Sequence, residues 1–189
     1  MTARKPTAPH AEATVLAVDD LPEYLDLYEF HLGGRYDLRT ATDGESALAV
    51  LDDDVDVALI DRQMPDLSGD EVLERVREVG YDCRVAFVSA VEPGRDVLEM
   101  GFDTYLLKPV TGERLIETVE RLLRRARYDD DVQELYALCS KRAVLDVHDG
   151  AEYPDLDARI EELRQSVDHA VAEFSSDDYL ASFYDLPRA

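Results

Sequence analysis

The chain has 189 residues, of which 46% are apolar, and this fraction excludes a wholly disordered protein because it supports a folded core. It carries 43 Asp and Glu against 20 Lys and Arg, a formal charge of −23 that argues against a nucleic-acid surface, although high salt weakens that argument. Such an acidic folded chain, with Lys5, Lys108 and Lys141 as its only lysines, favours adaptation to high salt, where screening weakens self-repulsion. The alternative is an acidic protein without that adaptation.

Cysteine use and the start of the chain bear on its location. Cys83 and Cys139 are the only cysteines, and their wide spacing matches neither a disulfide framework nor a metal motif. Residues 1–12 are rich in Ala, Pro, Thr and charge, so we expect a disordered lead without a signal peptide. No apolar run approaches the length that spans a membrane. These features predict a cytoplasmic protein with no membrane contact.

Short apolar runs alternate with amphipathic stretches in the first two thirds of the chain. We expect strands at residues 14–18, 36–41, 55–60, 84–88 and 104–107. Helical spacing of apolar residues predicts helices over 22–32, around 44–51 and around 72–76, a short one near 93–100, and a fifth around 115–123. Five strands alternating with five helices predict an α/β, doubly wound parallel sheet covered on both faces.

The central strand is the run at residues 55–60, which ends at Asp61. Pro65 and the turn residues after it stop the strand and lead into a helix. In open α/β sheets, ligands bind at the edge formed by the carboxyl ends of the strands. A carboxylate there can be a nucleophile, a metal ligand or a helix cap, and this stretch alone leaves all three open.

Polar residues also follow the other strands, namely Asp19 and Asp20, Ser89, and Lys108. Three carboxylates at one edge would raise one another's pKa values, and a hard cation such as Mg²⁺ removes that conflict. A remaining oxygen of Asp61 could then attack a phosphoryl group while the metal and Lys108 neutralise its charge. Each residue alone also fits a cap, a turn or a solvated base. Their common position at the strand ends favours a phosphoryl-transfer site.

The motifs at these strand ends resemble those of a known family. They are Val18-Asp19-Asp20, Leu59 to Pro65 with Gly69, Val88-Ser89-Ala90, and Tyr105 to Pro109. Over residues 13–127 the chain resembles the receiver domain of two-component response regulators. The resemblance implies a flavodoxin-like, five-stranded sheet and phosphorylation of Asp61 by the phosphohistidine of a sensor histidine kinase.

The same resemblance implies a Mg²⁺ site. Asp19 and Asp20 would be the acidic pair that binds the metal directly or through water, with Asp20 ranked first as direct ligand. Asp61 and the backbone carbonyl of Gln63 would complete the set. Such a receiver catalyses only its own phosphorylation and dephosphorylation, so the chain would not be an enzyme with an external substrate.

The resemblance also assigns roles to the later strand ends. Ser89 and Tyr105 would be the switch pair, with Tyr105 swinging from an exposed to a buried position on phosphorylation. Lys108 would bind the phosphoryl group, and its bond to Pro109 would be cis. The family commonly has Gly-Ala before the fifth strand, whereas this chain has Gly101-Phe102, which puts the local packing in question.

Residues 128–189 form the predicted output region. Two amphipathic stripes, at 132–145 and 156–174, predict a helical hairpin or half of a homodimeric bundle. The change from basic to acidic residues at 124–131 marks a domain boundary or the acidic start of a helix. By its placement, its Tyr-Asp-Asp beginning and its late Tyr/Phe cluster, the region resembles the HalX module of haloarchaeal regulators.

Three function classes remain from the sequence. The first is a phosphorylation-switched signalling protein whose helical C-terminal region, of unassigned target, engages another protein. The second is a DNA-binding transcriptional regulator with an atypical acidic output, although the sequence contains no helix-turn-helix with a basic recognition helix. The third is a true enzyme, such as a phosphohydrolase with an aspartyl-phosphate intermediate, which Gln63 disfavours because the haloacid-dehalogenase pattern has a second Asp two residues after the nucleophile. A receiver that acts only as a phosphate sink is a further alternative.

Overall fold

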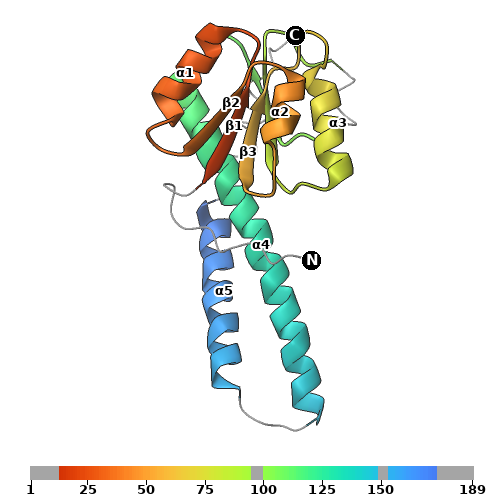
Figure 1. Cartoon of the computed structure of the whole chain (residues 1–189). Coiled ribbons are helices and arrows are strands. Elements are labelled where there is room, and N and C mark those ends of the chain that lie inside the picture. Colours follow the sequence, from red (N-terminus) through yellow and green to blue (C-terminus); the bar gives the residue numbers. More distant parts are fainter. Residues whose placement is uncertain (1–12, 95–99, 149–152, 174–189) are drawn as a thin grey trace. The chain divides into compact units, whose positions relative to one another are not determined.

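A computed structural model of the chain describes residues 13–94, 100–148 and 153–173. The chain divides into two compact units, of which the first includes residues up to Leu123 and the second begins at Arg124. The first unit is built on one five-stranded parallel sheet with the order β2-β1-β3-β4-β5, and Figure 1 shows β2, β1 and β3 of this sheet beside one another. Its strands are β1 (Thr14–Val18), β2 (Asp37–Ala41), β3 (Val55–Ile60), β4 (Arg84–Ser89) and β5 (Thr104–Leu107). The predicted fold class is confirmed, and every strand lies within one residue of its expected limits.

Both faces of this sheet are covered by helices, and every residue of β1 and β3 is therefore buried. Alternate strand residues enter two separate hydrophobic clusters, so that Val15 lies in one cluster and Leu16 in the other. Helix α1 and the opening turns of α4 complete the first cluster, and α2 and α3 complete the second (Figure 1). These helices are α1 (Pro22–Leu32), α2 (Gly44–Val50), α3 (Gly69–Val79) and α4 (Gly112–His148).

Local chemistry sets where these helices begin and end. Pro22 occupies the first turn of α1, and the carboxylate of Asp43 caps α2 by accepting a backbone N–H. Ser68 and Glu71 form a reciprocal capping box at the start of α3, and Gly80 ends that helix with a φ of 86°. As a result, α1 and α3 begin close behind the carboxyl ends of β1 and β3.

Helix α4 differs from the prediction because it is one continuous helix of 37 residues. The sequence suggested two helices, and either a boundary or a helix start at the charge change of residues 124–131. In the structure that stretch lies inside α4. It contains neither Gly nor Pro, and opposite charges four residues apart, such as Arg125 and Asp129, stand on the same helix face. The short helix expected near residues 93–100 falls largely outside the described residues.

In the second unit the rest of α4 pairs with α5 (Pro154–Glu173). Arg159 forms an ion pair with Glu134 at 2.9 Å, and Arg142 forms one with Asp157 at 2.7 Å. The partners' order shows that the two helices run antiparallel, as in the predicted hairpin. Its turn and the late Tyr/Phe cluster lie outside the described residues. Of the helices in the described ranges, none is long and apolar enough to cross a membrane.

Candidate functional site

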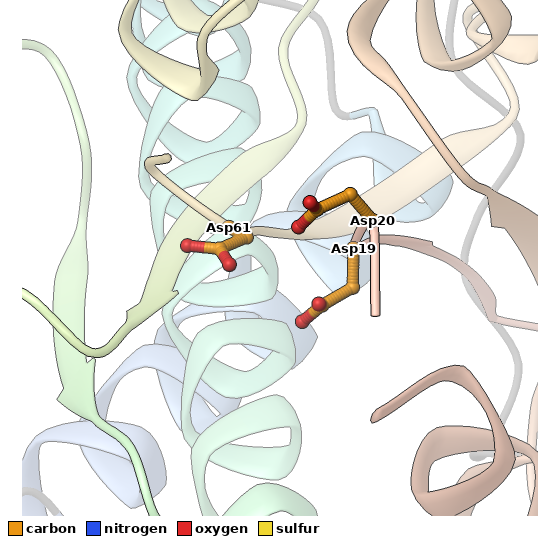
Figure 2. A group of neighbouring side chains, drawn as sticks. All are labelled: Asp19, Asp20 and Asp61. Atoms are coloured by element: carbon orange, nitrogen blue, oxygen red, sulfur yellow. The ribbon is translucent and has the colours of Figure 1, made fainter. Parts of the chain in front are cut away.

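Three aspartates gather at the carboxyl ends of two neighbouring strands. Val18 of β1 pairs with Ile60 of β3, so Asp19 and Asp61 leave the sheet at the same level, and the N–H of Asp61 donates to the carbonyl of Val18. Carboxylate oxygens of Asp19, Asp20 and Asp61 lie within 4.8 Å of one another. Figure 2 shows the side chain of Asp61 beside those of Asp19 and Asp20. The predicted convergence of these residues is present in the fold.

The ammonium group of Lys108 balances part of this negative charge. The ammonium nitrogen of Lys108 lies 2.7 Å from Oδ2 of Asp19 and 2.7 Å from Oδ2 of Asp61, with only 4% of the lysine side chain exposed. Burial lowers the pKa of Lys108, but hydrogen bonds and charge from the two aspartates outweigh it, so the pKa is raised and the ammonium stays charged. The Lys108–Pro109 peptide bond is cis, in agreement with the resemblance.

The aspartates differ in burial and in partners. Asp19 is fully buried, and this burial raises the pKa of its carboxyl group despite the hydrogen bond from Lys108. Asp20 is partly exposed and makes no hydrogen bond or ion pair with any described residue. Asp19 therefore has its partners in the protein, whereas Asp20 is the more exposed of the two. Three carboxylates and one ammonium leave an excess of negative charge, which suits a hard divalent cation.

Sequence reasoning missed two tyrosines of α1 that contact this site. The hydroxyl of Tyr28 donates to Oδ2 of Asp19 at 3.3 Å, and the ring centroid of Tyr24 lies 3.9 Å from the ammonium nitrogen of Lys108. Burial and the charge of Asp19 raise the pKa of Tyr28, so its hydroxyl remains a donor. The sequence signal was present, because both tyrosines lie in the helix that directly follows the acidic pair.

The loop after β3 shapes the surroundings of Asp61. The backbone N–H of Gln63 donates to Oδ1 of Asp61 at 3.1 Å, and the N–H of Gly69 donates to the carbonyl of Arg62. A Cβ atom on Gly69 would lie 2.2 Å from the carbonyl oxygen of Asp61. Only glycine therefore allows the start of α3 to approach the strand end so closely. Arg62 and Asp70 form an ion pair that spans the same loop.

Ser89 and Tyr105 are linked through one backbone residue. Ser89 is fully buried, and its Oγ accepts a hydrogen bond from the backbone N–H of Val91 at 3.4 Å. The hydroxyl of Tyr105 donates a hydrogen bond to the backbone carbonyl of Val91 at 2.7 Å. The ring of Tyr105 lies between exposed and buried and packs near Phe87 and Phe102, at centroid distances of 5.9 and 6.0 Å. Phe102 also packs edge-to-face against Phe87, so the fold accommodates a phenylalanine at the position where the family commonly has alanine. Tyr105 thus already has a hydrogen-bond partner at the end of β4.

Two family models match the chain. The model described as a response regulator receiver domain matches residues 15–120, and the model described as the HalX domain matches residues 124–183. Together they cover the sheet unit and the helical unit in the predicted order. The receiver match alone extends over more than half of the chain.

Individual proteins agree with these matches. The chain is 46% identical over 168 residues to a Haloferax volcanii protein named "Putative transcriptional regulator", covering 85% of this chain and 29% of that protein. It is 34% identical to the transcriptional regulatory protein CpxR of Klebsiella pneumoniae, covering 63% of this chain and 53% of CpxR. The chain thus spans less than a third of the first relative and about half of the second.

A solved structure shows the architecture of the sheet unit. A CheY-like receiver domain protein from Methanospirillum hungatei superimposes with a TM-score of 0.59 and 25% identity, covering 63% of this chain and 99% of that one. The sheet order, the acidic cluster and the model matches agree with one another. The chain belongs to the response regulator receiver family and carries a HalX domain after its receiver domain.

Proposed function

We propose that this protein works in a two-component phosphorelay, in which Asp61 accepts a phosphoryl group from a sensor histidine kinase. The main support for this proposal is the group of three aspartates whose carboxylate oxygens lie within 4.8 Å of one another. The ammonium nitrogen of Lys108 lies 2.7 Å from Oδ2 of Asp61 in the same group. Membership of the receiver family supports a phosphohistidine as donor. The phosphoryl group would leave the histidine nitrogen as the Asp61 oxygen bonds to phosphorus, and the acceptor is the protein's own side chain.

Mg²⁺ is the metal that this donor set suits best. Asp20 and Asp61 would supply carboxylate oxygens, Gln63 a backbone carbonyl, and Asp19 a contact through water. The bound cation would neutralise charge on the transferring group. The oxygen-only donors and the excess of negative charge over Lys108 fit a hard cation, and the open carboxylate of Asp20 fits a direct ligand.

The chain's own residues would supply the remaining chemistry. Asp61 would be the nucleophile. Its backbone N–H is held by the carbonyl of Val18 at the end of β1, and its Oδ1 accepts a hydrogen bond from the N–H of Gln63. Lys108 would place positive charge on a phosphoryl oxygen, and the hydroxyl of Ser89 would donate a hydrogen bond to another. The contact of Tyr105 with the Val91 carbonyl would carry the change at Ser89 to the surface near β5.

The output would be read by the helical HalX unit. Helix α4 contributes residues to both units, so one helix connects the receiver to the output region. We propose that phosphorylation changes contacts of this region with another protein or with a second copy of the chain. DNA binding by an acidic output is the second candidate, because the Haloferax and Klebsiella relatives are both named as transcriptional regulators.

Phosphorylation by a small donor tests the acceptor directly. The chain is incubated with acetyl phosphate and Mg²⁺ at high salt, and the gain of one phosphoryl group is measured by intact-protein mass. Asp61→Asn should abolish labelling, whereas Asp66→Asn, an exposed acid in the same loop, should label like the parent. Undiminished labelling of Asp61→Asn would overturn the assignment. A salt-dependent DNA-binding titration with and without phosphorylation separates the two output candidates.

A further inference from the structure

Helix α1 presents two tyrosines to the site. Tyr24 and Tyr28 are four residues apart and therefore lie on the same helix face. The hydroxyl of Tyr28, a fully buried residue, lies 3.3 Å from Oδ2 of Asp19. The ring of Tyr24 lies under the ammonium of Lys108, at 3.9 Å from centroid to nitrogen. Each tyrosine thus contacts one of the two residues of a buried ion pair.

The hydrogen bonds of Asp19 show why the hydroxyl matters. Oδ1 of Asp19 accepts the N–H of Leu21 at 3.2 Å, whereas Oδ2 is shared by Lys108 and Tyr28. If Lys108 turns toward a phosphoryl group on Asp61, Oδ2 of Asp19 loses its cation. A buried carboxylate oxygen without a donor is costly, so the remaining hydroxyl of Tyr28 lowers the cost of that movement.

Tyr24 acts on the other member of the pair. A cation held over the face of an aromatic ring is attracted by the ring's quadrupole, and this attraction does not depend on the ring's hydroxyl. Lys108 therefore keeps one favourable contact while its hydrogen bonds change partners. The two tyrosines differ in what they offer, because Tyr28 supplies a hydroxyl and Tyr24 supplies a ring face.

We propose that Tyr28 and Tyr24 are positioning residues that let Lys108 move from Asp19 to the phosphoryl group, because the hydroxyl of Tyr28 keeps a hydrogen bond to Asp19 and the ring of Tyr24 keeps its contact with the ammonium. This inference rests on the proposed role of Asp61 as phosphoacceptor. Tyr28 also belongs to the hydrophobic core, so its replacement must keep the ring in place. Tyr28→Phe meets that condition because it removes only the hydroxyl.

The test uses beryllofluoride, which stands in for the phosphoryl group on an aspartate, with the full chain at high salt and saturating Mg²⁺. Fluorine NMR or calorimetry measures its affinity, and Mg²⁺ affinity is measured separately without beryllofluoride. Tyr28→Phe should weaken beryllofluoride binding about five- to tenfold, as expected for the net contribution of one ordinary hydrogen bond, while Mg²⁺ affinity stays within about twofold. A purely structural defect would lower both affinities together.

At position 24 the matched variants test the ring of the tyrosine and not its hydroxyl. Tyr24→Phe keeps the ring face and should bind beryllofluoride like the parent, whereas Tyr24→Leu removes the face and should bind it several-fold more weakly. Equal beryllofluoride affinity in Tyr28→Phe and the parent, or parallel losses of both affinities, would overturn the inference and leave the proposed function standing. A parent chain that binds no beryllofluoride would overturn both.

Discussion

The ammonium nitrogen of Lys108 lies 2.7 Å from Oδ2 of Asp61, although 47 positions separate the two residues in the chain. The contact exists because Asp61 follows β3 and Lys108 follows β5, with β4 as the one strand between them. Lys108 also contacts Asp19, so one cation holds two buried carboxylates. The site retains excess negative charge, and its response to added cations follows from this.

We expect Mg²⁺ to raise the midpoint of thermal unfolding, because an ion that binds only the folded state stabilises it by mass action. Asp20→Ala should greatly reduce this increase and weaken Mg²⁺ binding, since the cation loses its most accessible carboxylate. Asp26→Ala, which removes an exposed acid of α1, is the matched control and should respond like the parent. Calorimetric titration at constant high salt measures the affinities. The same Mg²⁺ affinity in Asp20→Ala and the parent would show that Asp20 is not a ligand.

Gly69→Ala should destabilise the receiver unit by about 1–3 kcal/mol, because the new methyl group overlaps the carbonyl oxygen of Asp61 and the backbone must shift. The shift should also slow labelling of Asp61 by acetyl phosphate. Gly34→Ala is the control, since a Cβ at Gly34 meets no atom within 4 Å. Denaturant unfolding and labelling rates are compared for the two variants. A Gly69→Ala chain as stable and as reactive as Gly34→Ala would contradict the close approach.

Ser89→Ala should still accept a phosphoryl group at Asp61 but should transmit the change poorly. The Oγ of Ser89 accepts a hydrogen bond from the N–H of Val91, and the hydroxyl of Tyr105 donates one to the carbonyl of Val91. Loss of the Oγ therefore removes the hydrogen-bonded link between the site and the ring of Tyr105. Hydrogen exchange over residues 100–148 and the size of the particle by light scattering are measured with and without beryllofluoride. The parent should change and Ser89→Ala should change less. No response in the parent would indicate a phosphate sink.

Leu163→Ala should destabilise the helical unit by about 2–5 kcal/mol, because the leucine is 2% exposed and its loss leaves a cavity. Val171→Ala, on the same helix but 53% exposed, should cost less than about 0.5 kcal/mol. Denaturant unfolding is followed by circular dichroism, and the receiver's acetyl phosphate labelling serves as a check on the other unit. Equal effects of the two substitutions would mean that α5 does not pack through Leu163.

Much of the receiver could be predicted from the sequence because its signals are local. A buried parallel strand is a short apolar run, and a strand end is marked where that run meets a polar residue, as at Ile60 and Asp61. Because all strands of a parallel sheet end at one edge, the sequence also predicted that Asp19, Asp61 and Lys108 would meet. The continuity of α4 through residues 124–131 was not predicted, because the two units divide at Arg124 while the helix itself runs on without a break.

Partner choice inside the site was decided by the tertiary structure. Asp19 and Asp20 are neighbours of the same type, yet the direction in which each leaves β1 buries the first against Lys108 and leaves the second open. Tyr28 fits the apolar stripe of α1 in the sequence, and only the packing of α1 beside the sheet brings its hydroxyl to Asp19. Hydrogen bonds form over about 3 Å, and distances on that scale between residues far apart in the chain depend on the completed fold.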